Sequence, residues 1–438
     1  MKIAHISDLH LRKHLPGSSL GNSRRSREVP DLFISAIDEM STLSPDLVVV
    51  TGDICDYPFY AMDDPVMIRR GVRDMQDVAD ALTRLSCPSI VIRGNHDHPR
   101  TFDEVFGGQP DEIEVCGHRV IVFHDDEVNT NVPQRMGSER AKLVRVLSDD
   151  DPRPQIHVQH YLVWPEKNEG YPHTYREAVA LKEQLVSSGK VRLCLSGHYH
   201  PGLAPEESEG AWFAAAPAFT DGQHPWWVYD LDADGLRMQA HATPGNTSQR
   251  PAVFLDRDGT INPQPSYRTG PEEMHLIPGA AEALRRLSDA GYALIVISNQ
   301  SCVGYGWVTA EMVGEVNDRM ADLLYGAAGV EFDGIYCCHH SPQADLPEYR
   351  ADHPHIKPSP GALLDAAELH HIDLSQSWMV GDSISDLEAG RNAGTRTALV
   401  RTGHGWKSEE ELVDGLADVV TDDISGVVTH ILNTDSEQ

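Results

Sequence analysis

Five short apolar runs in the first half of the chain each stop at residue types that bind metal ions. The stops are Asp8-Leu-His10, Asp53, Asn95-His96-Asp97, His160 and His198-Tyr-His200. Each run is typical of a buried strand, and strand ends within one open sheet meet at one edge, so these side chains are expected to share a crevice. Asp, His and Asn without Cys suit Mn²⁺, Fe or Zn²⁺ better than a structural thiolate zinc site does.

The number of these ligands indicates two divalent transition metals, because one cation cannot use them all. A carboxylate that bridges two ions about 3.5–4 Å apart lets the pair polarise a phosphoryl group and generate a hydroxide in line with the leaving oxygen. Asp53 is central in the order of the ligands and is the natural bridge. The chemistry predicted for this half is hydrolysis of a phosphate ester.

The second half of the chain offers a carboxylate nucleophile. In Val253-Phe-Leu-Asp256-Arg-Asp258-Gly-Thr260, two carboxylates leave a strand and enter a tight Gly turn, where both can address one phosphate. Attack of a carboxylate on phosphorus gives an aspartyl phosphate, provided that a cation and positive donors neutralise the phosphoryl oxygens. Residues at later strand ends could hold the cation and the phosphoryl oxygens, namely Ser298, Asn299, Lys357, Asp382 and Asp386.

The periodicity of apolar residues predicts the elements that position these groups. In the first half, apolar runs alternate with helical patterns at Asp31–Leu43 and Met75–Leu85, and closely spaced short strands follow from Trp212 to His241. The segment Ala242–Arg250 is small, polar and aperiodic, as linkers are. We therefore predict one domain over residues 1–245, a linker over 246–250 and a second domain over 251–438.

Strands and helices alternate again after Pro251. The expected elements are a strand at Ala252–Leu255, a helix near Gly279–Ala290, a strand at Ala293–Ser298 and a helix at Thr309–Tyr325. Such alternation is typical of a parallel sheet with right-handed crossovers. The predicted fold class is α/β.

Composition excludes several classes of protein. The 438 residues include 36 Lys and Arg against 67 Asp and Glu, and the net charge of −31 disfavours nucleic acid as a partner without excluding it. No apolar run approaches the ~18 residues that a membrane span needs. Seven scattered cysteines, and a strand that starts already at Lys2, favour a reducing cytoplasmic location and no leader segment.

The motifs Asp8-x-His10, Gly-Asp53, Gly-Asn95-His96-Asp97, His160 and Gly-His198-x-His200 together resemble those of the calcineurin-like metallophosphoesterases, over residues 1–245. The resemblance implies a β-sandwich flanked by helices. It implies one metal at Asp8, His10, Asp53 and His200, and a second at Asp53, Asn95, His160 and His198. It also implies His96 as an outer-sphere acid or transition-state stabiliser, with Asp97 as its orienting partner.

The second half resembles the haloacid-dehalogenase superfamily over residues 250–433, with all four motifs in order. This resemblance implies a Rossmann-like parallel sheet. The implied roles are Asp256 as nucleophile, Asp258 as general acid and base, and Ser298 and Lys357, beside Asn299, as phosphate ligands. Mg²⁺ is expected on Asp256, Asp382 and the carbonyl of Asp258, with Asp386 supporting it indirectly.

Phe254–Asn262, Ser298–Ser301 and Tyr336–His340 are similar to segments of the heptose-bisphosphate and histidinol-phosphate phosphatases, which carry a zinc loop patterned Cys-x-His and Cys-x-Cys. Here the resemblance implies Cys337-x-His339 and His353-Pro-His355 as the two pairs. One thiolate and three imidazoles are a competent tetrahedral set for Zn²⁺. The alternative is that the loop has lost its metal and that these are surface residues.

Three departures from this subfamily bear on the substrate. Ile356 stands where the sugar phosphatases place an Arg, Gly304-Tyr305 replaces a small-Arg pair, and Ser383 replaces a lysine. Fewer cations leave less positive charge for a second phosphate. A monophosphate is therefore expected rather than a heptose bisphosphate.

The preferred hypothesis is a bifunctional phosphohydrolase that acts on small phosphorylated metabolites such as sugar phosphates. The second hypothesis is nucleic-acid end processing by a nuclease joined to a 3′-phosphatase, which needs a basic aromatic groove; Arg24–Arg27 is the one compact basic cluster. The third is a scaffold with inactive sites, which two complete catalytic sets oppose. The oligomeric state and the order of the two reactions stay open.

Overall fold

The computed structural model describes residues 1–16, 24–57, 62–129, 132–166, 175–245, 248–264 and 270–436. Within the predicted linker, Asn246 and Thr247 lie outside the described residues. The chain divides into two compact units, and the division falls between Gly245 and Asn246. Each unit has its own sheets and its own apolar core.

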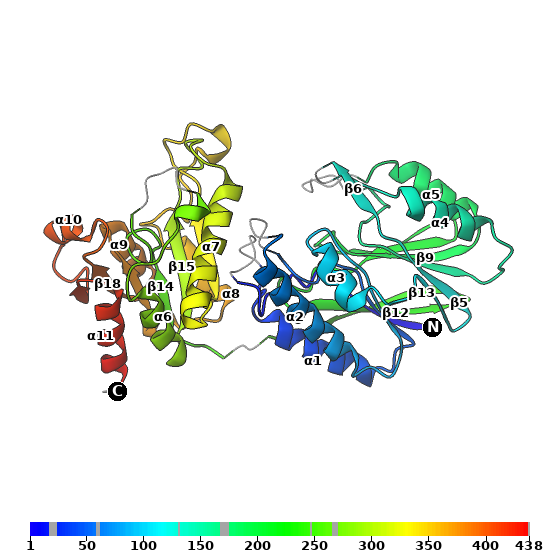
Figure 1. Cartoon of the computed structure of the whole chain (residues 1–438), viewed down its shortest axis with the longest axis horizontal. Helices are drawn as coiled ribbons and strands as arrows, with labels where there is room; N and C mark the ends of the chain where they lie inside the picture. The colour runs from blue at the N-terminus through cyan, green and yellow to red at the C-terminus, as the bar shows by residue number, and fades with distance from the viewer. Residues whose placement is uncertain are drawn as a thin grey trace. The chain divides into compact units, whose positions relative to one another are not determined.

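Two mixed sheets build the first unit (Figure 1). One has the strand order β13 (Gly235–Ala242), β12 (Pro225–Asp232), β1 (Lys2–Ile6), β2 (Leu47–Val50) and β3 (Ser89–Val91). The other has the order β10 (Leu203–Ser208), β11 (Ala211–Ala215), β9 (Val191–Ser196), β8 (Gln155–Val158), β5 (His118–Val122) and β4 (Glu112–Val115). β1, β2 and β3 run parallel, as do β5, β8, β9 and β11. β6 (Asp126–Asn129) and β7 (Val132–Gln134) form a separate hairpin.

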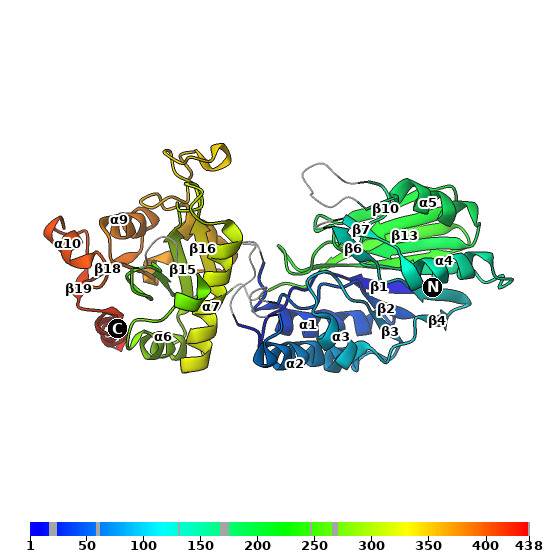
Figure 2. The ribbon, with the colours of Figure 1, turned by 45° about the horizontal axis from the view of Figure 1, so that its top comes forward.

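The two sheets of the first unit pack face to face. Ile3 and Val49 from one sheet and Val120, Ile156 and Leu195 from the other belong to one buried apolar cluster. In Figure 2, α1 (Val29–Thr42), α2 (Pro65–Leu82) and α3 (Pro99–Phe106) lie beside the first sheet, and α4 (Gly137–Ser148) and α5 (Ala178–Ser187) lie on the second. The predicted β-sandwich flanked by helices is confirmed.

Helix α2 begins at Pro65, well before the predicted start at Met75. The Asp64 side chain accepts hydrogen bonds from the main-chain N–H groups of the first turn, and Pro65 occupies that turn. Both are helix-start signals. The apolar pattern missed the first turns because Gly71, a poor helix former, interrupts it.

Within the described residues, one parallel sheet of six strands builds the second unit. Its strand order is β16 (Gly334–Cys338), β15 (Ala293–Asn299), β14 (Ala252–Leu255), β17 (Trp378–Gly381), β18 (Arg396–Val400) and β19 (Val419–Thr421). The helices are α6 (Ala280–Asp289), α7 (Ala310–Ala328), α8 (Gly361–Leu369), α9 (Ile384–Ala393), α10 (Gly405–Glu410) and α11 (Ile424–Ser436), with short turns η2 (Pro271–Glu273), η3 (Pro347–Tyr349) and η4 (Leu374–Gln376). In the described parts of both units, no helix is long and apolar enough to cross a bilayer.

Side chains along β14 alternate between two cores. Val253 and Leu255 pack with residues of α6, α7 and α11, whereas Ala252 and Phe254 pack with residues of α8 and α9. Successive side chains of a strand point to opposite faces, which explains the alternation. The sheet is thus covered by helices on both faces, and the predicted Rossmann-like parallel sheet is confirmed.

Gly71 of α2 approaches Tyr57 closely, and replacing it is predicted to destabilise the first unit. A Cβ atom at Gly71 would lie 1.4 Å from the Tyr57 hydroxyl oxygen, and Tyr57 is buried. We expect Gly71→Ala to lower the free energy of unfolding by about 1–3 kcal/mol, as overpacking does. Urea unfolding followed by fluorescence measures this change.

Gly326→Ala is the matched control, because Gly326 also lies inside a helix and a Cβ atom there would meet nothing within 4 Å. We expect this control to leave the free energy of unfolding unchanged or to raise it by about 0.5–1 kcal/mol, since Ala favours a helix more than Gly does. Equal losses in the two variants would contradict the importance of the Tyr57 contact.

Candidate functional site

The predicted ligands of the first unit lie together at the carboxyl ends of five strands. Asp8 and His10 follow β1, Asp53 follows β2, Asn95 follows β3, His160 follows β8, and His198 and His200 follow β9. Ligand atoms lie within 4.8 Å of one another in three overlapping groups: Asp8, His10 and His200; His10, Asp53 and His96; and Asp53, His160 and His198. The expectation of a single sheet is wrong, because both sheets of the sandwich contribute parallel strands whose ends meet here.

Asp8, His10 and His200 form the first of two adjoining clusters. The Nε2 atoms of His10 and His200 lie 3.3 Å apart, and they lie 4.0 and 3.8 Å from Asp8 Oδ1. Asp53 approaches the same cluster with its Oδ2 atom, which lies 3.6 Å from His10 Nε2. Asp8 and His10 are completely buried.

Asp53 also belongs to the second cluster. Its Oδ2 atom lies 3.5 Å from His160 Nε2. That nitrogen in turn lies 3.1 Å from His198 Nδ1 and 3.0 Å from Asn95 Oδ1. One carboxylate oxygen therefore faces both clusters, which is the arrangement that a bridging ligand of two cations requires.

Hydrogen bonds on the far side of two imidazoles turn them toward the clusters. His160 donates from Nδ1 to the carbonyl oxygen of Thr51 at 2.6 Å, and His200 Nδ1 lies 3.0 Å from Asp221 Oδ2. Metal-bound histidines are oriented in the same way by an oxygen acceptor on the other ring nitrogen. In both residues Nε2 is therefore the atom that faces the cluster.

The charge of these clusters fits divalent cations. Burial lowers the pKa of His160, but Asp53 and Asp8 outweigh burial and raise it to about 9. Burial raises the pKa of Asp53, but His160 and His96 hold it well below its usual value. The buried carboxylates thus need positive charge at these positions, and a metal ion supplies that charge in place of protons.

Four of the ligand residues have a left-handed backbone. The φ angle is 52° at Asp8, 44° at His10, 49° at Asp53 and 64° at His198. Residues other than glycine adopt this region at a cost on the order of 1 kcal/mol each, and such residues concentrate at functional sites. The left-handed residue ends the strand abruptly and turns the ligand toward the cluster.

His96 lies in the cluster, but its orienting partner is Asp56 and not Asp97. The Nδ1 atom of His96 lies 2.7 Å from Asp56 Oδ1. The Asp97 carboxylate accepts hydrogen bonds from the main-chain N–H groups of Ile54, Cys55 and Gly94, each at 2.9 Å. The expectation for Asp97 is therefore wrong, because its oxygens are engaged in holding the backbone around the site.

The sequence analysis missed Asp56, and its position three residues after Asp53 was the available signal. Asp56 is buried, and it also lies 3.6 Å from His10 Nδ1 and 3.5 Å from Arg24 Nη1. Burial raises the pKa of Asp56, but hydrogen bonds from His10 and His96 hold it well below its usual value. An ionised Asp56 therefore connects a candidate metal ligand to His96.

In the second unit, three buried carboxylates surround one lysine. Oxygen atoms of Asp256, Asp382 and Asp386 lie within 4.8 Å of one another. Lys357 Nζ lies 2.6 Å from Asp256 Oδ1 and from Asp386 Oδ1, and it donates to the Ile297 carbonyl oxygen at 2.8 Å. One ammonium group against three carboxylates leaves a negative cluster of hard oxygens, which fits Mg²⁺.

Asp258 lies beside this cluster and not within the group of converging oxygens. Its carboxylate accepts two hydrogen bonds from Arg257, at 3.0 and 2.9 Å, one from Asn262 at 2.9 Å and one from Gln300 at 2.7 Å. Burial raises the pKa of Asp258, but Arg257 lowers it below its usual value. A role of Asp258 at the cation therefore falls to its main-chain carbonyl.

Ser298 and Asn299 stand at the end of β15. The Ser298 hydroxyl oxygen lies 2.9 Å from Gln300 Nε2. The Asn299 side chain bonds to both polar groups of the Lys357 main chain, at 3.1 and 3.2 Å, so it positions that lysine. Both residues line a cavity of 460 Å³ that also contains Asp256 and Lys357.

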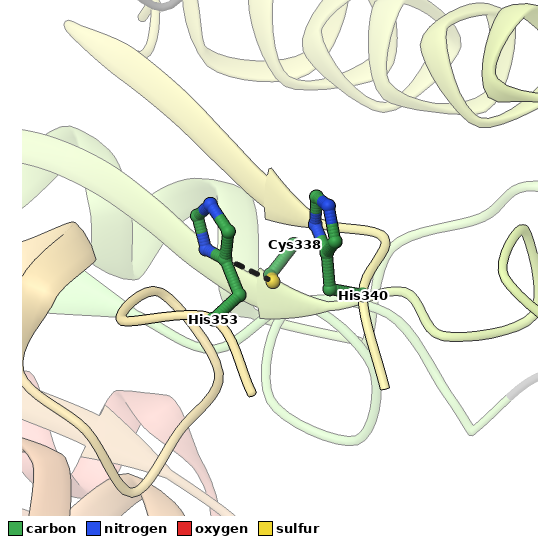
Figure 3. Close-up of side chains that lie close together, drawn as sticks. All are labelled: Cys338, His340 and His353. Carbon is green, nitrogen blue, oxygen red and sulfur yellow. Dashed lines mark hydrogen bonds between the residues drawn. The ribbon is translucent and has the colours of Figure 1, made fainter. Parts of the chain in front are cut away.

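Cys338, His340 and His353 converge just beyond β16 (Figure 3). Cys338 Sγ lies 4.0 Å from His353 Nδ1, and the rings of His340 and His353 stack with centroids 4.3 Å apart. His355 is next to this group, with its ring centroid 4.8 Å from that of His353 and its Nε2 atom 2.6 Å from Asp365 Oδ2. These donors are of the types that hold zinc.

The predicted pair Cys337 and His339 is therefore wrong by one residue. Cys337 and Cys338 are the last residues of β16, and successive strand side chains point to opposite faces. The Cys337 sulfur accordingly contacts the Asn317 side-chain amide at 3.3 Å, whereas Cys338 faces His353. The spacing Cys-x-His occurs in both registers, so spacing alone did not distinguish them.

The charge around Asp256 predicts that Mg²⁺ displaces a proton. Burial, opposed by Lys357 and assisted by Asp386 and Asp382, raises the pKa of Asp256 to about 8. At pH 7 the cation-free cluster therefore holds about one proton that Mg²⁺ must replace. Calorimetric Mg²⁺ titrations in buffers of different ionisation enthalpy are expected to show this release, and the apparent affinity is expected to rise with pH.

Asp382→Asn is the control for this titration, because it removes one carboxylate of the cluster. We expect it to weaken Mg²⁺ binding and to abolish the dependence on buffer. A binding enthalpy that is independent of buffer at pH 7 in the unaltered chain would contradict the charge described here.

Replacing Cys337 and Cys338 one at a time tests which of the two cysteines binds zinc in the loop. Cys338→Ser is expected to lose about one Zn²⁺ per chain, because a thiolate is a principal ligand of such a site, and Cys337→Ser is expected to keep it. Elemental analysis of the dialysed protein measures the zinc content. Equal zinc in the two variants would show that the loop holds no ion through Cys338.

Two protein families match the chain. The calcineurin-like phosphoesterase family matches residues 1–202, and the HAD-hydrolase-like family matches residues 356–427. The D-glycero-beta-D-manno-heptose-1,7-bisphosphate 7-phosphatase of Salmonella typhi is 39% identical over 176 residues, covering 39% of this chain and 93% of that protein. The D-glycero-D-manno-heptose-1,7-bisphosphate 7-phosphatase of Thermosynechococcus vestitus is 41% identical over 162 residues, covering 36% of this chain and 81% of that protein.

Solved structures with similarity to the chain include two phosphatases. A D,D-heptose 1,7-bisphosphate phosphatase from B. bronchiseptica, in complex with magnesium and phosphate, is 30% identical, with a TM-score of 0.38 over 42% of this chain and 99% of that one. A dimetal phosphatase from Danio rerio is 17% identical, with a TM-score of 0.44 over 56% of this chain and 96% of that one. From the family matches and the curated relatives, the chain is a phosphoric ester hydrolase: its second unit belongs with the haloacid-dehalogenase-like phosphatases, and residues 1–202 match the calcineurin-like phosphoesterase family.

Proposed function

We propose that the chain is a bifunctional enzyme for small phosphorylated metabolites. Residues 1–245 carry a dinuclear-metal phosphoesterase, and residues 251–438 carry a Mg²⁺-dependent phosphatase with an aspartate nucleophile. The first assignment rests on the single Asp53 oxygen that faces two histidine clusters. The second rests on Asp256, which is buried beside Lys357 and two further carboxylates.

In the first unit the two cations are held by the seven ligands that converge at the strand ends: Asp8, His10, Asp53, Asn95, His160, His198 and His200. Mn, Fe or Zn ions held there would supply polarisation of the phosphoryl group and a bound water of lowered pKa. Burial lowers the pKa of His96, but Asp53 and Asp56 outweigh it and raise that pKa above its usual value. His96 thus carries a proton for the leaving oxygen, and Asp56 orients it.

In the second unit Asp256 attacks phosphorus, and the bond from phosphorus to the alcohol oxygen breaks. Lys357 and Ser298 bind the phosphoryl oxygens, and Mg²⁺ held by Asp256 and Asp382 would supply further positive charge against them. Asp258 is the general acid and base of this reaction. Because Arg257 lowers its pKa, Asp258 must take up a proton together with the substrate before it protonates the departing alcohol, and it takes a proton again from the water that hydrolyses the aspartyl phosphate. Cys338, His340, His353 and His355 hold a structural Zn²⁺ in the neighbouring loop.

The cavity of the second unit favours a substrate with one phosphate. Lys357 is engaged by two carboxylates, and Arg257 is paired with Asp258. Among the described residues that line the cavity, no other lysine or arginine is present, and Glu273 adds negative charge. A second phosphate group of the substrate would therefore find no unpaired lysine or arginine among these lining residues to neutralise its charge. Val308 and Met312 supply an apolar part of the wall, which suits the CH face of a sugar.

Asp53→Asn and Asp256→Asn are expected to separate the two activities. Removing a nucleophile costs on the order of 10³-fold or more, so Asp256→Asn should lose the hydrolysis that the second unit carries out and keep that of the first unit. Asp53→Asn should show the reverse, because both cations depend on its carboxylate. A screen of phosphodiesters, sugar monophosphates and sugar bisphosphates on the unaltered chain and both variants measures this.

Each variant serves as the control for the other, since each leaves the second site untouched. If both activities fall together in either variant, the assignment of one activity to each unit is wrong. Preference for a bisphosphate, or for 3′-phosphorylated oligonucleotides with steep salt dependence, would contradict the proposed substrate class.

A further inference from the structure

A chain of buried hydrogen bonds runs behind the first metal cluster. The Tyr229 hydroxyl oxygen lies 3.3 Å from His5 Nδ1, and His5 Nε2 lies 2.9 Å from Thr51 Oγ1. Thr51 Oγ1 donates to Ser7 Oγ at 2.6 Å, and the Ser7 hydroxyl bonds to the Asp8 carboxylate. All five side chains are completely buried, so solvent does not compete for these bonds.

Each proton in this chain has one direction when Asp8 is an ionised ligand. A carboxylate only accepts, so Ser7 must donate to Asp8 and must therefore accept from Thr51. Thr51 has then used its one proton, so it must accept from His5 Nε2. His5 is thus the tautomer protonated at Nε2, and its Nδ1 atom is left to accept from Tyr229.

His5 can both donate and accept in this chain because it stays neutral. Complete burial lowers its pKa to about 3, so the ring keeps one donor and one acceptor at physiological pH. A protonated ring would have two donors and could not accept from Tyr229. Hydrogen bonds aligned in one direction polarise one another, which strengthens the last bond to Asp8.

Thr51 connects this row of hydrogen bonds to the second ligand cluster, which contains His160. Its hydroxyl leads through Ser7 to Asp8, and its carbonyl oxygen accepts from His160 Nδ1 at 2.6 Å. Gly197 packs closely against Ser7 and Thr51: a Cβ atom at Gly197 would lie 1.9 Å from Ser7 Oγ and 2.9 Å from the Thr51 carbonyl oxygen. The rotation of the Thr51 side chain and the place of its carbonyl therefore affect both clusters.

We infer that His5 is a positioning residue for the dinuclear centre, which it serves by donating from Nε2 to Thr51 so that Ser7 is held as a donor to Asp8. This inference rests on the proposed function of the first unit. It differs from a purely structural role, in which an apolar side chain of similar size would serve equally well in the same buried place.

Titration of Mn²⁺ into the metal-depleted full chain tests this inference. The free ion is followed by electron paramagnetic resonance, in a parent that carries Asp256→Asn and Asp382→Asn so that the second unit contributes little. His5→Leu removes the donor to Thr51 and is expected to weaken Mn²⁺ binding about 10-fold, as loss of an outer hydrogen bond to a metal site does. His5→Gln keeps a donor for Thr51 and is expected to restore most of the affinity.

Two further variants make the result decisive. Thr51→Val removes the hydroxyl while it keeps the carbonyl for His160, so it should reproduce the loss seen in His5→Leu even if the latter folds poorly. Tyr229→Phe removes only the outermost donor and should stay close to the parent. Thermal unfolding of each variant in the presence of chelator separates a loss of metal affinity from a loss of fold.

The outcomes separate the inference from the function on which it depends. Parent-like affinity in His5→Leu and Thr51→Val, or equal losses in His5→Leu and His5→Gln, would overturn the positioning role. If the parent itself bound no Mn²⁺ that Asp53→Asn removes, the dinuclear centre would fail instead. Weakened binding in His5→Leu with recovery in His5→Gln establishes the inference.

Discussion

Both sites depend on one electrostatic constraint, which is that each gathers more buried negative charge than neighbouring side chains neutralise by themselves. Asp8 and Asp53 are almost completely buried, and Asp256, Asp382 and Asp386 surround a single lysine. A buried carboxylate without a partner costs several kcal/mol, so the folded chain must take up protons or metal ions at these places. The raised pKa values of His160 and Asp256 have this cause, because a bound proton reduces the net negative charge of each site.

The scaffold holds these groups together against their mutual repulsion. Asp8 and Asp53 in the first unit and Asp256 and Asp382 in the second follow parallel strands, which place their carboxyl ends side by side. Asp386 is brought in from the first turn of α9. Tight turns then bring the side chains inward. In the first unit the turns use left-handed residues such as Asp53, and in the second Gly259 has φ of +90° and would carry a Cβ atom only 2.1 Å from Asp382 Oδ2.

Strands and motifs were predictable from the sequence because they are local. β14 was predicted residue for residue, and the ligand-bearing residues of the first unit follow apolar runs that are visible in the sequence. It was not predictable that the ligands of the first unit come from two sheets, because the sequence of a strand does not show which sheet the strand joins. Asp56 was missed because its role arises only when the turn after Asp53 folds back on His96. Cys337 and Cys338 differ only in the face to which a strand directs them, which depends on the register of β16.

The two units meet the same constraint with different donors, and this difference bears on which ions each unit takes. In the first unit, four imidazoles accompany Asp8, Asp53 and Asn95, and the nitrogens of His160 and His200 are turned inward by oxygen acceptors behind them. Nitrogen donors favour transition metals over Mg²⁺. In the second unit the converging donors are carboxylate oxygens, and Lys357 removes part of their charge without adding a donor to the cation. A hard oxygen set of this kind suits Mg²⁺, which keeps several waters and needs only one or two carboxylates. Two such donor sets in one chain therefore favour different ions from the same mixture.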